Sequence, residues 1–113
     1  MNIWNEQNIP DGLENIFVFG SNDEGKHGKG AALNARQLFG AKMGQAEGLQ
    51  GRSYAIITKS MKDIYSRSSK SSISLESIRE SVRRFYVFAN NNRHLNFYVT
   101  KIGCGLAGYS EAE

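Results

Sequence analysis

Two glycine-dense segments, each directly following a short apolar run, constrain the fold of this 113-residue chain more than any other feature. Residues 20–32 follow the apolar run 16–19, and residues 103–109 follow the run 96–102. Glycine has no Cβ, so its backbone reaches positive φ and its amide groups can approach an anion closely. Two such segments at the ends of strands predict a crevice for a phosphorylated ligand.

Short apolar runs predict three strands that are buried on both faces, because each run is continuous rather than alternating and is too short for a helix. The strands are expected at residues 16–19, 54–58 and 96–102. The segments outside strands and helices are expected to be turns, a loop and an exposed connection, at residues 1–14, 41–52 and 59–74 respectively.

Two further stretches predict helices. The first is expected to begin at Gly30 and to end before Gly40, which is a plausible C-terminal glycine. Its inward face is expected to consist of Ala31, Ala35, Leu38 and Phe39. The second helix is amphipathic, follows Ser74 as its N-cap and ends in the asparagines at 90–92.

The alternation of strands with helix-sized crossovers predicts a single α/β domain over residues 1–113, with a mainly parallel sheet covered by helices. Residues 110–113 resemble the first turn of a third helix, so we expect this architecture to be short at its C-terminus. Ligands of such sheets bind beyond the carboxyl ends of the strands. The residues expected at that edge are Gly20, Ser21, Asn22, Lys59, Gly103, Cys104 and Gly105.

Composition narrows the class of protein. Fourteen basic and eleven acidic residues give a net charge of +3, which suits an anionic ligand. The basic residues are too scattered along the chain for the dense basic stripe of a nucleic-acid interface. The single cysteine excludes an internal disulfide and the usual multi-cysteine metal motifs. No apolar run approaches the roughly 20 residues of a membrane span, and the N-terminus lacks the pattern of a signal peptide. The expected location is the cytoplasm.

The first glycine segment matches neither common nucleotide motif. No Gly-Lys-Ser/Thr closes it as in a Walker A loop, and the G-x-G-x-x-G spacing is absent. Asn22 would either contact a ribose hydroxyl or shape the loop as an Asx-turn, and the sequence leaves both open. His27 is expected to be a solvated loop residue rather than a base, and His94 a surface residue.

Three other side chains have chemistry that suits a site. Lys59 leaves a buried strand at the expected edge, so it is either a nucleophile or phosphate contact, or a solvated strand-end lysine. Cys104 is favoured as a small packing residue over a nucleophile because no paired histidine is evident. Tyr109 would stack on a base or ribose, or pack in the core.

Taken together, these motifs resemble the macrodomain family, a module that binds ADP-ribose. The similar features are Phe-Val-Phe-Gly-Ser-Asn at 17–22, Gly-Lys-Gly-Ala-Ala at 28–32 and Ile-Gly-Cys-Gly-Leu at 102–106. The branch of terminal ADP-ribose protein glycohydrolases also has a similar strand to Tyr-Ala-Ile-Ile-Thr-Lys at 54–59. Small macro-like proteins of phages and prophages resemble the chain in Gly-Gln-x-Glu-Gly-Leu-Gln-Gly at 44–51.

The resemblance implies a three-layer architecture and an ADP-ribose diphosphate held across both glycine segments. The implied ligand-binding residues beyond those of the first strand end are Gly28, Gly30, Ala31, Gly103, Cys104, Gly105, Leu106, Ala107, Gly108 and Tyr109. In the glycohydrolase branch a lysine attacks the anomeric carbon, and Lys59 stands at the matching position. The family's assisting acid is replaced here by Ala107, which removes a general acid/base group.

Three functions follow as competing expectations. The first is binding of ADP-ribose or a similar nucleotide, and the second is removal of ADP-ribose from a protein or nucleic acid with Lys59 as the catalytic residue. The third is an interaction module of phage type that has lost the ligand and acts in the host cytoplasm. No cofactor, metal or membrane is expected as a partner, and an oligomer is compatible with each reading.

Overall fold

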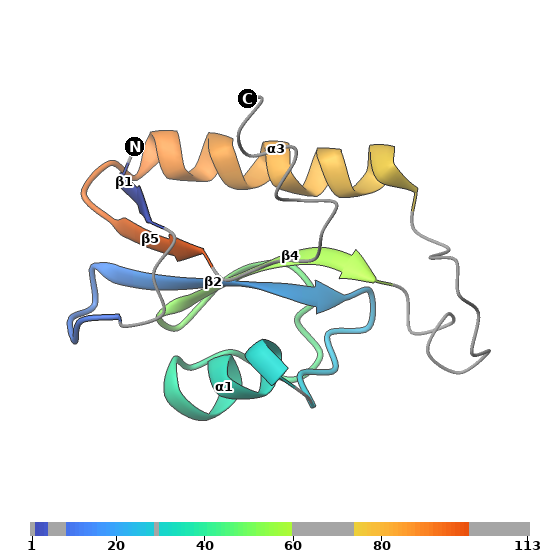
Figure 1. Cartoon of the computed structure of the whole chain (residues 1–113), viewed down its shortest axis with the longest axis horizontal. Coiled ribbons are helices and arrows are strands. Elements are labelled where there is room, and N and C mark those ends of the chain that lie inside the picture. The colour runs from blue at the N-terminus through green and yellow to red at the C-terminus, as the bar shows by residue number, and fades with distance from the viewer. Residues whose placement is uncertain (1, 5–8, 29, 60–73, 100–113) are drawn as a thin grey trace.

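The computed structural model describes residues 2–4, 9–28, 30–59 and 74–99, which form a mixed sheet between two helices (Figure 1). The strands are β1 (Asn2–Trp4), β2 (Asn15–Asn22), β3 (Gly48–Gln50), β4 (Ser53–Lys59) and β5 (Asn96–Val99). They lie in the order β1-β5-β2-β4-β3. Neighbours run parallel except for β3, which is antiparallel to β4. The predicted α/β class is confirmed, with a mixed sheet.

The two helices cover opposite faces of the sheet. Helix α1 (Gly30–Leu38) lies below it and α3 (Leu75–Asn91) lies above it in the view of Figure 1. The reason is the alternation of side chains along β2. Ile16 and Val18 belong to the apolar cluster under α3, whereas Phe17 and Phe19 belong to the cluster that contains Ala35 of α1. A strand buried on both faces, as predicted for residues 16–19, is confirmed.

One end of each predicted helix, the start of α3 and the end of α1, follows the expected local rules. Ser74 is the N-cap of α3, and its hydroxyl oxygen accepts a hydrogen bond from the amide of Ser77 at 3.1 Å. Gly40 follows α1 with a φ of 76°, the left-handed conformation that favours glycine at a helix end. Neither helix in the described ranges is long and apolar enough to cross a bilayer.

The structure corrects several boundaries. Residues 2–4 and 48–50 are strands rather than turns or loop, because β1 pairs with β5 and β3 pairs with β4. Strand β2 continues beyond Phe19 to Asn22 because Gly20 and Ser21 pair with β4. The predicted inward position of Leu38 is wrong: its exposed fraction is 68%, because the buried contacts of α1 follow the four-residue spacing of Ala31, Ala35 and Phe39.

Candidate functional site

The carboxyl ends of β2 and β4 meet at the same edge of the sheet. The two strands are parallel neighbours, and Asn22 is the register partner of Lys59. The register shifts between Ser21 and Asn22, so β4 contributes one extra residue, Thr58, whose hydroxyl lies 3.4 Å from the carbonyl oxygen of Ser21. The prediction that the residues after the first two strands share an edge is therefore confirmed for the backbone.

Asn22 shapes the loop that follows β2. Its side-chain oxygen accepts hydrogen bonds from the amides of Glu24, at 3.2 Å, and Lys26, at 2.9 Å. Its amide nitrogen donates to the carbonyl oxygen of Lys26 at 2.8 Å. These three bonds occupy most of the capacity of the side chain, as in the Asx-turn alternative. The neighbouring Ser21 is also buried, and its hydroxyl donates to the carbonyl oxygen of Asn22 at 3.2 Å.

His27 is buried, with an exposed fraction of 0%, so the expectation of a solvated loop residue is wrong. The ring packs edge-on against Phe19 with the centroids 5.1 Å apart. Its Nε2 atom lies 3.1 Å from the carbonyl oxygen of Gln45 and 3.2 Å from the side-chain oxygen of Gln50. Both neighbours are acceptors, so Nε2 carries the hydrogen. The reason for the burial is the pairing of this loop with residues 42–50, which are distant in sequence. His94, by contrast, is exposed as predicted.

Gln50 connects the loop that contains His27 to Lys42 and Gln45, which lie between α1 and β3. Its side-chain oxygen also accepts a hydrogen bond from the amide of Lys42 at 2.8 Å, and its side-chain nitrogen donates to the carbonyl oxygen of Gln45 at 2.8 Å. The exposed fraction of Gln50 is 1%, so these bonds replace water that the amide has lost. A buried amide in this position therefore specifies one arrangement of the loop.

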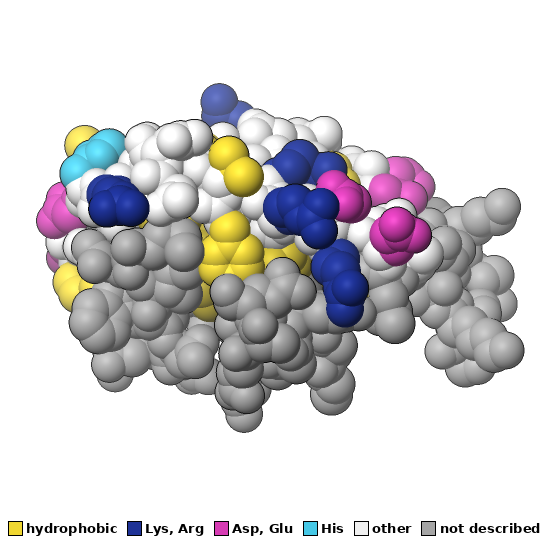
Figure 2. Space-filling view, turned by 90° about the horizontal axis from the view of Figure 1, so that it is seen from above, with side chains coloured by type: hydrophobic (Ala, Val, Ile, Leu, Met, Phe, Trp, Pro, Cys, Tyr) yellow, Lys and Arg dark blue, Asp and Glu magenta, His cyan; other side chains and the backbone are white. Residues whose placement is uncertain are grey.

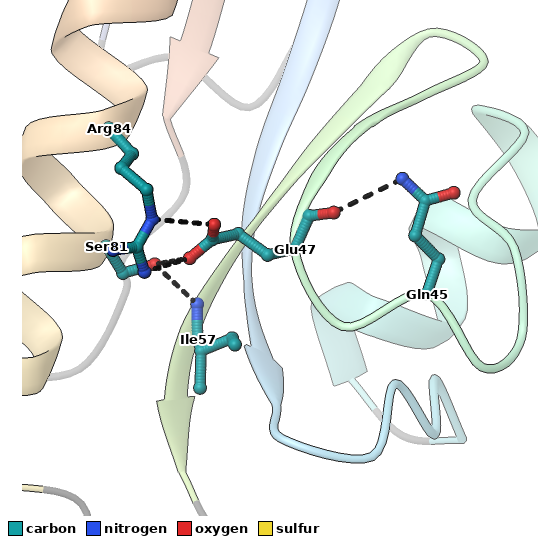
Figure 3. Close-up of polar contacts among 5 residues, drawn as sticks. All are labelled: Gln45, Glu47, Ile57, Ser81 and Arg84. Atoms are coloured by element: carbon teal, nitrogen blue, oxygen red, sulfur yellow. Dashed lines mark hydrogen bonds and ion pairs between the residues drawn. The ribbon is translucent and has the colours of Figure 1, made fainter.

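Glu47 links the same segment to helix α3 (Figure 3). Its carboxylate accepts two hydrogen bonds from the guanidinium of Arg84, at 2.7 and 2.8 Å, and one from the hydroxyl of Ser81 at 2.7 Å. Ser81 in turn accepts a hydrogen bond from the amide of Ile57 at 3.1 Å. Ile57 lies beyond the part of β4 that β3 covers, so the serine satisfies an edge amide.

The charges of this cluster shift the pKa values of their neighbours. The hydrogen bonds from Arg84 lower the pKa of Glu47, and burial of the carboxylate opposes them in part. The reciprocal hydrogen bonds to Glu47 raise the pKa of Arg84. Burial, followed by the negative charge of Glu47, raises the pKa of Tyr54 to about 12. The ion pair is therefore charged over the whole physiological range.

Of the predicted site glycines in the first segment, Gly20 lies within β2, whereas Gly28 and Gly30 lie at the start of α1. Gly28 and Gly30 are exposed, and Ala31 is half-buried. A Cβ added to Gly28 would meet no described atom within 4 Å. Helix α1 begins at Gly30 with no acidic side chain in its first turn, which leaves the positive end of the helix dipole uncompensated by its own residues.

Part of the predicted site lies outside the described residues. Only the backbone position of Lys59 is described. The predicted residues of the second glycine segment, Gly103, Cys104, Gly105, Leu106, Ala107, Gly108 and Tyr109, all lie outside the described ranges. The last described residue of β5, Val99, pairs with Val18, four residues before the end of β2.

Sequence reasoning missed three polar residues whose hydrogen bonds connect residues 45–50 to the loop after β2 and to α3: Glu47, Gln50 and Ser81. Residues 44–51 show no periodicity, and the glycines among them predicted a loop. The available signal was the presence of three polar side chains, Gln45, Glu47 and Gln50, among glycines. Ser81 stands on the inward face of an amphipathic helix, where a serine is uncommon and needs a partner.

The helix side of the molecule carries charges of both signs. The face over α3 shows Lys and Arg side chains beside Asp and Glu rather than a continuous basic stripe (Figure 2). Arg83 pairs with Glu80 at 3.2 Å, and Arg84 pairs with Glu47 at 2.7 Å. Among residues 2–4, 9–28, 30–59 and 74–99, His, Cys, Asp and Glu form no group of three that could hold a metal ion.

Comparisons of the chain with protein-family models, with curated proteins and with solved structures find no match.

Proposed function

We propose that the protein binds ADP-ribose or a related nucleotide diphosphate at the carboxyl edge of β2 and β4. The observation that carries this proposal is the register pair Asn22–Lys59, with a glycine-rich loop that leads from it into α1. In open parallel sheets, the crevice beyond such strand ends is the usual position of a nucleotide. A lysine at this edge supplies a cation for an anionic ligand.

The start of α1 supports the diphosphate as the anchoring group. The first amides of a helix have no partner within the helix, and its dipole favours an anion. Here the exposed residues Gly28 and Gly30 lie at that end, and no carboxylate in the first turn competes. No described atom lies within 4 Å of a Cβ added to Gly28, which favours close approach of a phosphate to this backbone.

The motifs supply the identity of the ligand class. The segments at 17–22, 28–32 and 102–106 resemble those of macrodomains, and a sheet between two helix layers is the arrangement that this resemblance implies. By the same resemblance, residues 103–109 form the second part of the diphosphate-binding site. The macrodomain assignment is therefore part of the proposal.

Calorimetry of the full chain with ADP-ribose, ADP and NAD tests the proposal, and we expect micromolar binding of at least one of them. In the variant Gly28→Val, the added Cβ meets no described protein atom within 4 Å, and the side chain would occupy space that the proposed diphosphate needs. We expect its affinity to fall about tenfold or more, which corresponds to roughly 1.4 kcal/mol. Gln37→Val, at an exposed position of α1, is the matched control. No heat with any nucleotide from the folded protein would contradict the proposal and favour the ligand-free interaction module.

A second candidate function is hydrolysis of an ADP-ribosyl bond. The favouring observation is the backbone position of Lys59 beside Asn22, where the glycohydrolase resemblance implies a nucleophile. The opposing feature is Ala107 in place of an acid. A deribosylation assay of wild type and Lys59→Ala separates these possibilities, because equal turnover in both would remove Lys59 from the reaction.

A further inference from the structure

Residues 45–50 contact both described parts of the candidate edge. On the α1 side they bind the loop 23–28, which follows β2. On the α3 side, Glu47 accepts a hydrogen bond from Ser81. Ser81 in turn accepts one from the amide of Ile57, two residues before the end of β4. The segment itself is not at the edge, so its role differs from that of a residue in contact with a ligand.

The first connection is the buried pair His27 and Gln50. The histidine Nε2–H points at two acceptors, the carbonyl oxygen of Gln45 and the side-chain oxygen of Gln50. The amide of His27 also donates to the sulfur of Met43 at 3.2 Å. The side chains of His27 and Gln50 are both buried. Breaking their hydrogen bonds without replacing them would leave buried polar atoms without partners. The loop 23–28 is therefore held in one conformation.

A close backbone approach reinforces this connection. The amide of Gly44 donates to the carbonyl oxygen of Gly25 at 2.8 Å. Gly25 has a φ of 67°, and a Cβ on it would lie 2.6 Å from the backbone nitrogen of Gln45. A residue with a side chain would force the two loops apart.

The second connection runs from Glu47 to β4. The carboxylate accepts from Ser81 and Arg84, and Ser81 accepts from the amide of Ile57, as Figure 3 shows. Ile57 is the register partner of Ser21 and stands two residues before Lys59. The same segment is therefore connected, through Ser81, to β4 two residues before its end, as well as to the loop after β2.

We propose that residues 45–50 position the two described parts of the binding edge before a ligand arrives, with His27 and Gln50 as positioning residues. This inference rests on the proposed nucleotide site. Ordering a loop in advance raises affinity, because the ligand does not have to order it on binding. Residues 45–50, to which the proposed binding function assigns no contact with the ligand, would thus act through the loop 23–28.

Amide hydrogen exchange of His27→Phe tests this role. The phenyl ring retains the packing against Phe19 but lacks the Nε2–H donor. We expect exchange at Gly25 and Gly44 to accelerate about tenfold and the affinity for ADP-ribose to fall by a similar factor. His27→Gln, whose amide nitrogen can replace Nε2–H, should restore slow exchange and affinity. Val82→Ala, a core truncation under α3, should lower global stability without this local effect.

A measurement on the wild-type protein covers the case in which His27→Phe does not fold. The amide of Gly25 donates to the carbonyl oxygen of Asn22, that of Gly44 to the carbonyl oxygen of Gly25, and that of Lys42 to the side chain of Gln50. If residues 42–50 hold the loop 23–28, these three amides should open together, with one protection factor and one urea dependence. Independent opening of Gly25, or unchanged exchange and affinity in a folded His27→Phe, would overturn the inference. Exchange needs no ligand, so an absence of ADP-ribose binding in wild type would contradict only the proposed function.

Discussion

The two faces of the sheet are stabilised in different ways. Under α3, nine buried residues form one cluster in which the rings of Tyr54, Phe85 and Phe97 are in contact, with centroid separations of 5.1 and 5.2 Å. Under α1, the apolar cluster of described residues is smaller and contains three buried alanines, and the buried polar pair His27 and Gln50 lies beside it. Apolar packing is non-directional, whereas buried hydrogen bonds hold only one geometry.

This difference fits the roles that we propose for the two faces. A long amphipathic helix of 17 residues on an aromatic layer supplies stability. Helix α1 has nine residues and begins with Gly-Ala-Ala, and Gly28, before this helix, and Gly30, its first residue, are exposed. The binding edge is therefore expected on the side with less apolar contact, where hydrogen bonds have to specify the loop conformation.

The largest effect is expected from truncating the aromatic layer. Phe97→Ala removes a buried ring that packs edge-on against Phe85 and Phe88. We expect the free energy of unfolding in urea to fall by about 3–5 kcal/mol. Val87→Ala, at a residue of α3 with an exposed fraction of 57%, should change it by less than about 0.5 kcal/mol. Similar losses in the two variants would contradict the assignment of the stabilising core to this face.

An intermediate effect is expected from removing the hydroxyl of Ser81, which connects α3 to β4 and to Glu47. Ser81→Ala leaves the amide of Ile57 without its acceptor and removes one donor to Glu47. We expect a loss of about 1–3 kcal/mol in the free energy of unfolding, together with faster exchange of the Ile57 amide. Ser77→Ala, at an exposed position of the same helix, is the control. An unchanged Ile57 exchange rate would show that this amide is satisfied in another way.

The smallest effect is a change in pH dependence. Arg84 lowers the pKa of Glu47 in the folded protein relative to about 4.3 in the unfolded chain. The unfolded chain therefore takes up the proton first on acidification, so the stabilisation is fully present above about pH 4.3 and is lost as pH falls through the folded pKa. Urea unfolding between pH 6 and 3 should show a shallower decline for Glu47→Gln than for wild type. Identical slopes would assign the acid sensitivity to other carboxylates.

Many of the strands and helices were predictable because they depend on local periodicity of apolar residues. The continuous run at 16–19 predicted a strand buried on both faces, and the spacing of apolar residues after Ser74 predicted α3 and its cap. The shared edge of β2 and β4 followed from their parallel order. The short strands β1 and β3 were missed because three residues carry no period, and only their neighbours stabilise them as strands.

By itself, the sequence determined the α/β class, the two helices, the central strands and the position of the first glycine loop at a sheet edge. These features depend on residues close together along the chain. The tertiary structure alone decided that His27 is buried, that Gln50 binds it and that Glu47 reaches α3. Such contacts join residues 23 to 37 positions apart, as in the pairs His27–Gln50, Glu47–Ser81 and Glu47–Arg84. Their partners exist only once the sheet has brought the loops together, because a polar side chain has no preferred long-range partner in an unfolded chain.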